Sequence, residues 1–374
     1  MSKLTELLEI HCPNGVKYKT IKETVGLNRG RRLTKNELSD DGLYEVYHGS
    51  KDTPLGLYDK YNAPKNTTIV VNTGGIGGVK FIENEFWCSD GSFWLGQSED
   101  IHPKYLYYCL SGYEKYFASK KRVGGVPTID RSVVEEFSFP VPPLAVQEEI
   151  VKILDRFAEY AAELQAELQA RQEQYEYYRN KLLTFNEIGG GSVIWMKMSE
   201  VYDMKAGKTI ISSMIENVKT LKNPYPCYGG NGLRGYVSEY NQQGNKVLIG
   251  RQGALCGNVC FANNSFYATE HAVVVSEKGY CLPRYTYHLL TKMKLNQYKT
   301  AGAQPGLSVS RLEKLLIPIP SMEMQLKIVS ILDRFDELIS DLAQGLPAEI
   351  TAVQEQYEYY RNKLLSFPKY KLSA

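Results

Sequence analysis

Two blocks of this chain occur twice, about 180 residues apart. Residues 171–183 read RQEQYEYYRNKLL and residues 353–365 read VQEQYEYYRNKLL, and the block ILDRF occurs at 153–157 and again at 331–335. This period is several times longer than the repeats of solenoid proteins. A chain of 374 residues is long enough for two domains. The repeat therefore predicts two copies of a domain followed by a helix, and two similar surfaces for a partner that has two sites.

Prolines mark the domain boundaries. A proline-rich segment, PVPP at 140–143 and IPIP at 317–320, precedes each helical block. Proline stops helices and restricts the residue before it, so we expect a stiff hinge at each segment. We predict an α+β fold with an internal pseudo-two-fold repeat, in four segments: α/β domains over 1–143 and 186–321, a central helix over 144–185 and a C-terminal helix over 322–374.

Each domain contains the same order of local signals. A β-branched run, TIVV at 68–71 and KVLI at 246–249, leads into a glycine-rich loop. Such a run is typical of a buried strand, and glycines permit the tight turns expected after it. Pro103 and Pro283 stand where a helix is expected to begin, because the first helical residue needs no N–H partner. We therefore expect one strand–loop–helix order in both domains.

The two helical segments carry apolar residues at alternating steps of four and three, which is typical of a coiled coil. We predict that the two helices, each about 60 Å long at about 40 residues, pair antiparallel with each other. The alternative is that each helix lies on its own domain. Gly345 and Pro347 coincide with an extra step of four, which predicts a kink or break there. The seam residues are Leu154, Phe157, Leu164, Leu168, Tyr175, Tyr178, Leu182, Leu332, Phe335, Ile339, Leu342, Val353, Tyr357, Tyr360 and Leu364.

Positive charge is concentrated in the second domain. Residues 186–321 carry 15 basic and 8 acidic residues, residues 1–143 carry 18 of each, and both helical segments are net negative. This distribution suits a polyanion that is bound by the domains and not by the helices. For the first domain, charge alone gives no support to this interpretation.

Composition also bears on the compartment and on metals. No apolar run approaches the roughly 20 residues that span a bilayer, and residues 1–10 do not resemble a signal peptide. We therefore expect no membrane association. Seven cysteines without a paired framework are typical of a reducing cytoplasm. Cys256 and Cys260 lie four residues apart without a second pair, so packed thiols explain them better than zinc, and we predict no metal site.

The loops of both domains carry side chains suited to DNA. Lysine and arginine neutralise phosphates, as in the basic and aromatic stretch KYFASKKR at 115–122. Arginine, asparagine and glutamine can also pair with base edges. Solvent exposure explains any one of these residues better, so the prediction depends on the loops as a set. The candidate DNA-binding residues are Arg31, Arg32, His48, Lys51, Asn72, Lys120, Lys121, Arg122, Asn231, Arg234, Arg251, Gln252, Lys299 and Gln304.

The sequence contains no arrangement of residues typical of catalysis. The run GGIGG at 74–78 fails the dinucleotide-binding pattern, because the third glycine would fall at Lys80. NPYP at 223–226 has the wrong order for the Asn-Pro-Pro-aromatic motif of amino-methyltransferases. The five histidines show neither metal-ligand spacing nor a nucleophilic partner, and His48 alone falls in a polar loop. We predict no catalytic residue.

The repeated blocks resemble the specificity subunit of type I restriction-modification systems. The resemblance is carried by PVPPLAVQEEIVKILDRF at 140–157, IPIPSMEMQLKIVSILDRF at 317–335 and the twice-used QEQYEYYRNKLL, and it covers nearly the whole chain. It implies that each domain is a target recognition domain for half of a split, asymmetric site in double-stranded DNA. It also implies two methyltransferase subunits and two restriction (motor-nuclease) subunits as partners. S-adenosylmethionine, ATP and Mg²⁺ would be used by those partners, and no cofactor would be bound by this chain.

Residues 162–169 add a detail to this resemblance. They read AELQAELQ, and related proteins carry tandem four-residue repeats in this helix, whose number sets the spacer between the half-sites. Four residues add about 6 Å of helix, slightly under two base pairs at roughly 3.4 Å each. A low-complexity run of good helix formers explains the same residues equally well.

Three functions fit these features. The first is a non-catalytic DNA-specificity scaffold, the second a self-sufficient methyltransferase or nuclease, and the third a coiled-coil adaptor without direct DNA recognition. Salt-dependent binding to a specific duplex separates the first from the third. Methyl transfer by the chain alone would indicate the second. Because the first domain is near neutral, we expect the chain to bind DNA weakly without its partners.

Overall fold

The computed structural model describes residues 3–122, 124–185, 193–253, 255–300, 306–340 and 345–370. The chain divides into two compact units. Unit 1 consists of Met1–Gln165 and Glu349–Ala374, and unit 2 of Ala166–Ala348. Each unit therefore contains a globular domain and parts of both helical segments.

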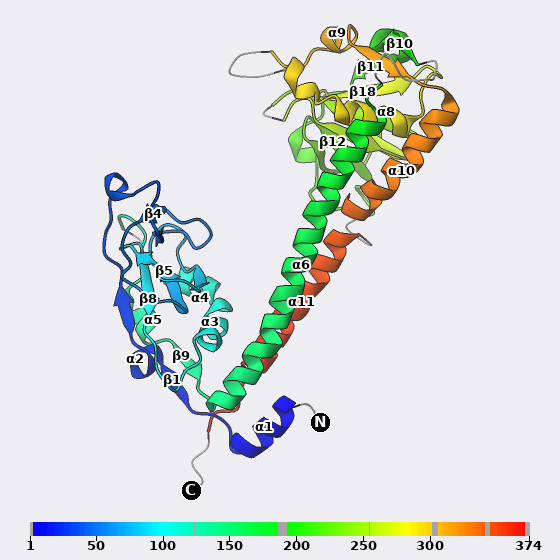
Figure 1. The fold of residues 1–374 in the computed structure, drawn as a ribbon. Helices are drawn as coiled ribbons and strands as arrows, with labels where there is room; N and C mark the ends of the chain where they lie inside the picture. The colour runs from blue at the N-terminus through cyan, green and yellow to red at the C-terminus, as the bar shows by residue number, and fades with distance from the viewer. Residues whose placement is uncertain are drawn as a thin grey trace. The chain divides into compact units, whose positions relative to one another are not determined.

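The described part of unit 1 contains three small sheets. The four-stranded sheet has the order β2 (Leu27–Arg29), β8 (Ser92–Leu95), β5 (Thr67–Val71) and β6 (Val79–Ile82). The three-stranded sheet consists of β4 (Gly56–Tyr58), β3 (Tyr44–Tyr47) and β7 (Trp87–Cys88), and a ribbon pairs β1 (Tyr18–Thr20) with β9 (Ser138–Pro140). Helix α3 (Pro103–Ser111) packs on β5 and β6 (Figure 1). The shorter helices are α1 (Lys3–His11), α2 (Ile21–Thr24), η1 (Lys35–Glu37), α4 (Glu114–Ser119) and α5 (Arg131–Glu135).

Unit 2 repeats this plan. One four-stranded sheet has the order β11 (Tyr202–Ala206), β18 (Ala272–Glu277), β15 (Lys246–Gly250) and β16 (Val259–Ala262). The other has the order β13 (Gly232–Val237), β12 (Tyr225–Gly229), β17 (Ser265–Ala268) and β14 (Gln242–Gln243), and a ribbon pairs β10 (Ile194–Lys197) with β19 (Leu316–Ile319). Helix α8 (Pro283–Lys292) is the counterpart of α3. The remaining elements are α7 (Met198–Val201), η2 (Ser212–Met214), η3 (Leu295–Tyr298) and α9 (Val309–Leu312).

The predicted buried strand and the helix that starts at a proline occur in both units, but three strands that the sequence did not predict lie between them, β6–β8 in unit 1 and β16–β18 in unit 2. All five residues of β5 are buried, and four of the five in β15 are, so each strand is the centre of its sheet. Helices α3 and α8 begin at Pro103 and Pro283, as expected. The β-branched composition of the strands and the proline at each helix start account for this agreement.

The proline-rich exits differ in part from the expected hinges. Pro140 lies in strand β9 and Pro318 in β19, so part of each exit is β-structure. Proline is tolerated there because a two-stranded ribbon leaves one edge without ladder hydrogen bonds. The buried Tyr105 hydroxyl donates to the Pro140 carbonyl at 3.0 Å, and Tyr285 donates to the Pro318 carbonyl at 2.9 Å. These bonds tie each ribbon to the helix that covers the central strand.

The helical segments form one long helix and two shorter ones. Helix α6 (Leu144–Leu182) is continuous, with its first 22 residues in unit 1 and its last 17 in unit 2. The C-terminal segment contains α10 (Met322–Ser340) and α11 (Leu346–Leu364), and Gly345 belongs to neither. The break predicted at Gly345 and Pro347 is therefore confirmed. Pro347 is the second residue of α11, where proline disrupts no helical hydrogen bond.

Within each unit, α6 contacts the other helical segment. In unit 1, the Phe157 ring stacks on Tyr360 at 5.3 Å, and the Tyr160 hydroxyl donates to Glu349 at 2.6 Å. In unit 2, the rings of Tyr178 and Phe335 stack at 5.5 Å. Because the repeat equates Phe157 with Phe335 and Tyr360 with Tyr178, the two units use the same pair with the helices exchanged. A continuous antiparallel coiled coil stays a prediction.

The seam residues follow the predicted periodicity of burial. Tyr360 is 39% exposed, and Leu342 lies outside the described residues. Leu154 belongs to the core of the first domain, and Leu332 to that of the second. The alternative, in which each helix lies on its own domain, therefore describes the first turns of α6 and α10. The buried seam residues are Leu154, Leu164, Tyr175, Leu332 and Val353; the half-buried ones are Phe157, Leu168, Tyr178, Leu182, Phe335, Ile339, Tyr357 and Leu364.

An aspartate in each ILDRF block joins a helix to the helix of its domain. In unit 1, Asp155 accepts from the Lys104 ammonium at 3.2 Å and from the Tyr108 hydroxyl at 2.5 Å. In unit 2, Asp333 accepts from Arg284 at 2.8 Å and from His288 Nε2 at 2.7 Å. The joints are equivalent in position but differ in their donors, because unit 2 uses an arginine and a histidine where unit 1 uses a lysine and a tyrosine.

The Asp333 joint shifts the pKa of two groups. Burial alone would raise the pKa of Asp333, but hydrogen bonds from His288 and Arg284 hold it below its usual value. Burial lowers the pKa of His288, although the bond to Asp333 opposes this effect. The His288 ring is 0% exposed, and its Nδ1 lies 3.0 Å from the Tyr175 hydroxyl. A neutral imidazole suits both contacts, since its Nε2–H can donate while its Nδ1 accepts.

No helix in the described ranges has the length and apolar character needed to cross a membrane. Among the same residues, no group of three histidine, cysteine or acidic side chains is arranged to hold a metal ion. All seven cysteines lie in the described part of the chain and carry free thiols; Cys256 is buried and Cys260 half-buried.

Candidate nucleic-acid interface

In unit 1, backbone hydrogen bonds connect the loops around the end of the central strand. Asn72 follows β5, and its N–H donates to the Gly91 carbonyl at 3.0 Å. Its carbonyl accepts from Ile129 N at 3.0 Å, and Gly75 N donates to the Gly49 carbonyl at 2.7 Å. These bonds hold together what we call the unit 1 loops, which are residues 47–51, 72–78, 89–91, 120–122 and 124–130.

The same connections recur in unit 2. Arg251 follows β15, and its N–H donates to the His271 carbonyl at 2.9 Å. Its carbonyl accepts from Leu307 N at 2.8 Å, as the Asn72 carbonyl does from Ile129 N. Thr269 N donates to the Tyr228 carbonyl at 2.9 Å, which repeats the bond from Ser89 N to the Tyr47 carbonyl at 2.9 Å in unit 1. Arg251 therefore occupies the position of Asn72. The unit 2 loops are residues 228–234, 251–253, 269–271, 299–300 and 306–308.

Glycine permits the close approach of these loops, as the sequence predicts. Gly74 has φ +84°, and a Cβ there would lie 2.6 Å from the Gly49 carbonyl oxygen. At Gly250, a Cβ would lie 1.9 Å from the Gly230 carbonyl oxygen. Any other residue would force the loops apart.

An asparagine side chain fixes one loop of each cluster. Asn62 bonds to both Cys88 N (2.7 Å) and Cys88 O (2.9 Å). Asn241 bonds in the same way to Ala268 N (2.8 Å) and Ala268 O (2.9 Å). Each bidentate pair precedes a loop segment, residues 89–91 in unit 1 and 269–271 in unit 2, and sets where that segment begins.

The candidate side chains of unit 1 fall into two groups. His48 lies inside the cluster, where its Nδ1 accepts from Gly91 N at 3.2 Å. Asn72 is buried, with 6% of its surface exposed. Arg31, Arg32, Lys120 and Lys121 are exposed, and the Lys120 ammonium lies 5.3 Å from the centre of the Tyr116 ring.

Two further basic candidates of unit 1 have acidic partners. The Lys51 ammonium lies 2.7 Å from Glu114, which also accepts from Val79 N at 2.9 Å. Arg122 pairs with Asp130. A phosphate contact by Lys51 or Arg122 would compete with these carboxylates, so the exposed cations are better placed for it. Their role in DNA binding stays a prediction.

In unit 2, Asn231, Arg234, Gln252 and Lys299 are exposed. Arg234 donates to the hydroxyl of Ser212 at 2.8 Å, and among the described residues no acidic side chain forms an ion pair with it. Arg251 is half-buried at the centre of the cluster. Gln304 lies outside the described residues.

Sequence analysis missed three side chains in these loops, one in unit 1 and two in unit 2. Asp90 and Glu270 occupy equivalent positions after the strands β7 and β17, and His271 follows Glu270. Asp90 lies 3.4 Å from His48, and Glu270 lies 3.4 Å from His271. The prediction that His48 alone falls in a polar loop is wrong, because His271 lies in one of the unit 2 loops. The signal was SDG at 89–91 aligned with TEH at 269–271, but neither segment has a distinctive periodicity.

Four buried polar atoms of these loops lack a hydrogen-bond partner within the described structure. They are Asn72 Oδ1, Arg251 Nε, Glu270 Oε2 and His271 Nδ1. Unsatisfied buried groups are costly and usually have a reason. Asn72 Oδ1 belongs to the unit 1 loops, and the other three atoms belong to the unit 2 loops.

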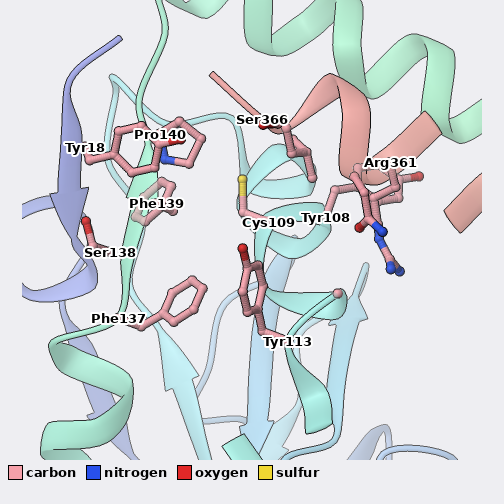
Figure 2. Close-up of a pocket in the computed structure, with 13 residues that line it drawn as sticks. Tyr18, Tyr108, Cys109, Tyr113, Phe137, Ser138, Phe139, Pro140, Arg361 and Ser366 are labelled. Carbon is pink, nitrogen blue, oxygen red and sulfur yellow. The ribbon is translucent and has the colours of Figure 1, made fainter. Parts of the chain in front are cut away.

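A pocket of about 250 Å³ lies elsewhere in unit 1, between β9, α3 and the end of α11. Figure 2 shows Tyr18 and Pro140 on one side and Arg361 and Ser366 on the other. None of the candidate DNA-binding residues lines it. In unit 2, Lys292 stands at the position of Gly112 and donates to the Leu183 carbonyl at 3.2 Å.

The comparison with known families is decisive. A family model described as the type I restriction modification DNA specificity domain matches residues 13–174 and 194–352. The chain belongs to this family. The resemblance inferred from the repeated blocks is thereby confirmed, and the chain is a DNA specificity subunit with two copies of the specificity domain.

Curated relatives agree with this family. The type I restriction enzyme EcoprrI specificity subunit of Escherichia coli is 42% identical over 254 residues, which cover 64% of this chain and 63% of that protein. This match therefore spans less than two thirds of that relative. The EcoR124I/EcoR124II specificity subunit of Escherichia coli is 30% identical over 350 residues, which cover 84% of this chain and 83% of that protein.

Solved structures show the same fold. The S subunit of a type I restriction-modification system from M. genitalium aligns with a TM-score of 0.66 at 19% identity, covering 96% of this chain and 98% of that chain. A second structure, whose description concerns complex assembly and conformational transition of the type I R-M system, aligns with a TM-score of 0.56 at 17% identity. The alignment covers 94% of this chain and 98% of that chain. The predicted α+β class with two recognition domains and long helices is confirmed.

Proposed function

We propose that this specificity subunit reads a split, asymmetric site in double-stranded DNA, with the loops of unit 1 on one half and those of unit 2 on the other. The observation that carries this proposal is that the loops of both units share the same backbone hydrogen bonds but present different side chains. Asn72 in unit 1 corresponds to Arg251 in unit 2, and Gly91 to His271. The same frame supports the same mode of approach to a groove, whereas different side chains favour different bases.

The chain acts here as a scaffold without catalysis. Two methyltransferase subunits and two restriction (motor-nuclease) subunits would bind it, and those partners would use S-adenosylmethionine, ATP and Mg²⁺. Residues 74–78 do not fit the glycine pattern of dinucleotide-binding loops, which supports the proposal that this chain itself binds no cofactor. The free thiols and the DNA ligand support action in the cytoplasm. In the proposed complex, α6 pairs antiparallel with α10 and α11 and sets the distance between half-sites.

A domain exchange tests this proposal. Residues 1–143 are replaced by the corresponding domain of another specificity subunit, and methylated sequences are mapped in cells that express the complete complex. One half of the recognised sequence should change and the other should stay. A change in both halves contradicts independent reading, and no sequence-dependent methylation at all favours the coiled-coil adaptor. Methyl transfer by the purified chain alone would support the self-sufficient enzyme instead.

A further inference from the structure

A buried glutamine stands at the start of each long helix. Gln147 is the fourth residue of α6, and Gln325 is the fourth residue of α10. Both side chains are 0% exposed. The sequence repeat aligns them, since they occupy the same place before the two ILDRF blocks. A primary amide is rarely buried unless all its polar atoms have partners.

In unit 1, the amide of Gln147 connects three segments. Its Oε1 accepts from His102 N at 2.8 Å, at the start of α3. Its Nε2 donates to the Asp100 carbonyl at 2.9 Å and to the Pro142 carbonyl at 2.8 Å. The helix, the loop before α3 and the proline-rich exit are thus held by one side chain.

In unit 2, Gln325 makes the same three bonds. Its Oε1 accepts from Leu282 N at 2.8 Å, at the start of α8. Its Nε2 donates to the Tyr280 carbonyl at 2.9 Å and to the Pro320 carbonyl at 3.0 Å. The recurrence of this geometry in both units indicates that it belongs to the architecture shared by the two domains and does not arise from chance packing.

The amide restrains the direction of the helix in a way that apolar packing does not. An apolar side chain tolerates small rotations of the joint, whereas three hydrogen bonds to fixed backbone atoms are satisfied in one orientation only. Helix α3 packs on β5, the strand that leads to Asn72. The angle between α6 and α3 therefore also sets the direction in which the unit 1 loops point relative to α6. Rotation at the joint would therefore change where those loops meet the DNA.

We propose that Gln147 and Gln325 are positioning residues that lock each recognition domain to its helix, and thereby restrict the spacer lengths at which both half-sites are read. This inference rests on the proposed reading of a split site. It predicts that loosening either joint broadens the accepted spacer without changing the bases read in either half. Each joint belongs to a different unit, so each single variant should have this effect.

The test uses the variants Gln147→Met and Gln325→Met, which keep side-chain length but remove the three hydrogen bonds. Each chain is expressed with its methyltransferase partners, and methylated sites are mapped across the genome. The readout is the ratio of methylation at spacers one base pair longer or shorter to methylation at the native spacer. We expect the ratio to rise on the order of tenfold, which corresponds to about 1.4 kcal/mol. Gln172→Met, at an exposed glutamine of α6, is the matched control and should leave the ratio unchanged.

The ratio separates positioning from stability. A role in folding alone lowers methylation at every spacer together, so an unchanged ratio in variants that still methylate overturns this inference. Gln147→Glu and Gln325→Glu keep one acceptor and lose both amide donors, and they provide the same readout if the Met variants do not accumulate. A wild-type chain that shows no split site overturns the proposed function as well. A wild-type split site with unchanged ratios in the variants overturns the positioning role alone.

Discussion

Replacing Asp333 by asparagine removes the charged centre of the joint in unit 2. Asp333 is 29% exposed, and it accepts hydrogen bonds from Arg284, which is 25% exposed, and from His288, which is fully buried. The substitution keeps the shape of the side chain, but it leaves His288 without a carboxylate partner and Arg284 with one carboxylate instead of two. Arg284 retains Asp336 at 2.7 Å, so its charge keeps one partner.

The expected loss follows from these contacts. Hydrogen bonds to charged groups contribute about 1.5–3 kcal/mol each, and the partial exposure of Asp333 places its bonds at the lower end. We expect Asp333→Asn to lower the free energy of unfolding of unit 2 by about 2–3 kcal/mol. For a unit of this size, that corresponds to a decrease in Tm of about 6 °C.

Differential scanning calorimetry of the full chain measures this effect. The control is Lys327→Ala, which breaks an ion pair with Glu323 whose side chains are 67% and 79% exposed. Solvent screens an exposed pair of this kind, so the control should lower Tm far less than Asp333→Asn does. If Asp333→Asn were no more harmful than Lys327→Ala, the joint would not hold the domain to its helix in the way described.

Two further predictions concern pH and base reading. The pKa of His288 is lowered in the folded chain, so the unfolded chain takes up a proton on this histidine first as pH falls. The free energy of unfolding of unit 2 should therefore decrease below about pH 6.5, by up to about 1.4 kcal/mol per pH unit. In His288→Gln, unfolding between pH 5 and pH 7 should show a smaller slope, and an identical slope would contradict the assignment. Arg251→Met should weaken DNA binding by the complete complex by on the order of tenfold and should relax base preference in one half-site only. Replacement of an exposed lysine, in Lys299→Met, should reduce the salt dependence of DNA binding without altering base preference. Competition binding with duplexes that carry single base changes measures both, and equal effects of the two variants would argue against a base contact by Arg251.

Much of the fold follows from local patterns in the sequence. The β-branched runs that became β5 and β15 and the helices that begin at Pro103 and Pro283 reflect short-range preferences. The break at Gly345 also follows from composition, because glycine and proline interrupt a helix wherever they lie. These features need no knowledge of which segments meet.

The features that the sequence did not predict depend on long-range contacts. Nothing local marks Gln147 as buried, because its partners at Asp100, His102 and Pro142 meet it only in the folded domain. The base-contact candidates were chosen by residue type, which overlooked the acidic Asp90 and Glu270 within the loops. Residue type also does not reveal an internal ion pair such as Lys51 with Glu114. For Gln147 and for Asp90 the repeat held a usable signal, since Gln325 and the acidic Glu270 stand at the equivalent positions in the other half.

The length of α6 provides the most direct test of the central claim, which is that two recognition domains read one duplex at a distance set by this helix. One additional Ala-Glu-Leu-Gln unit is inserted after Gln169, which adds about 6 Å of helix, and the methylated sites of the complete complex are mapped. The account predicts unchanged half-site sequences, separated by a spacer that is about two base pairs longer. An unchanged spacer, with methylation retained, would contradict it.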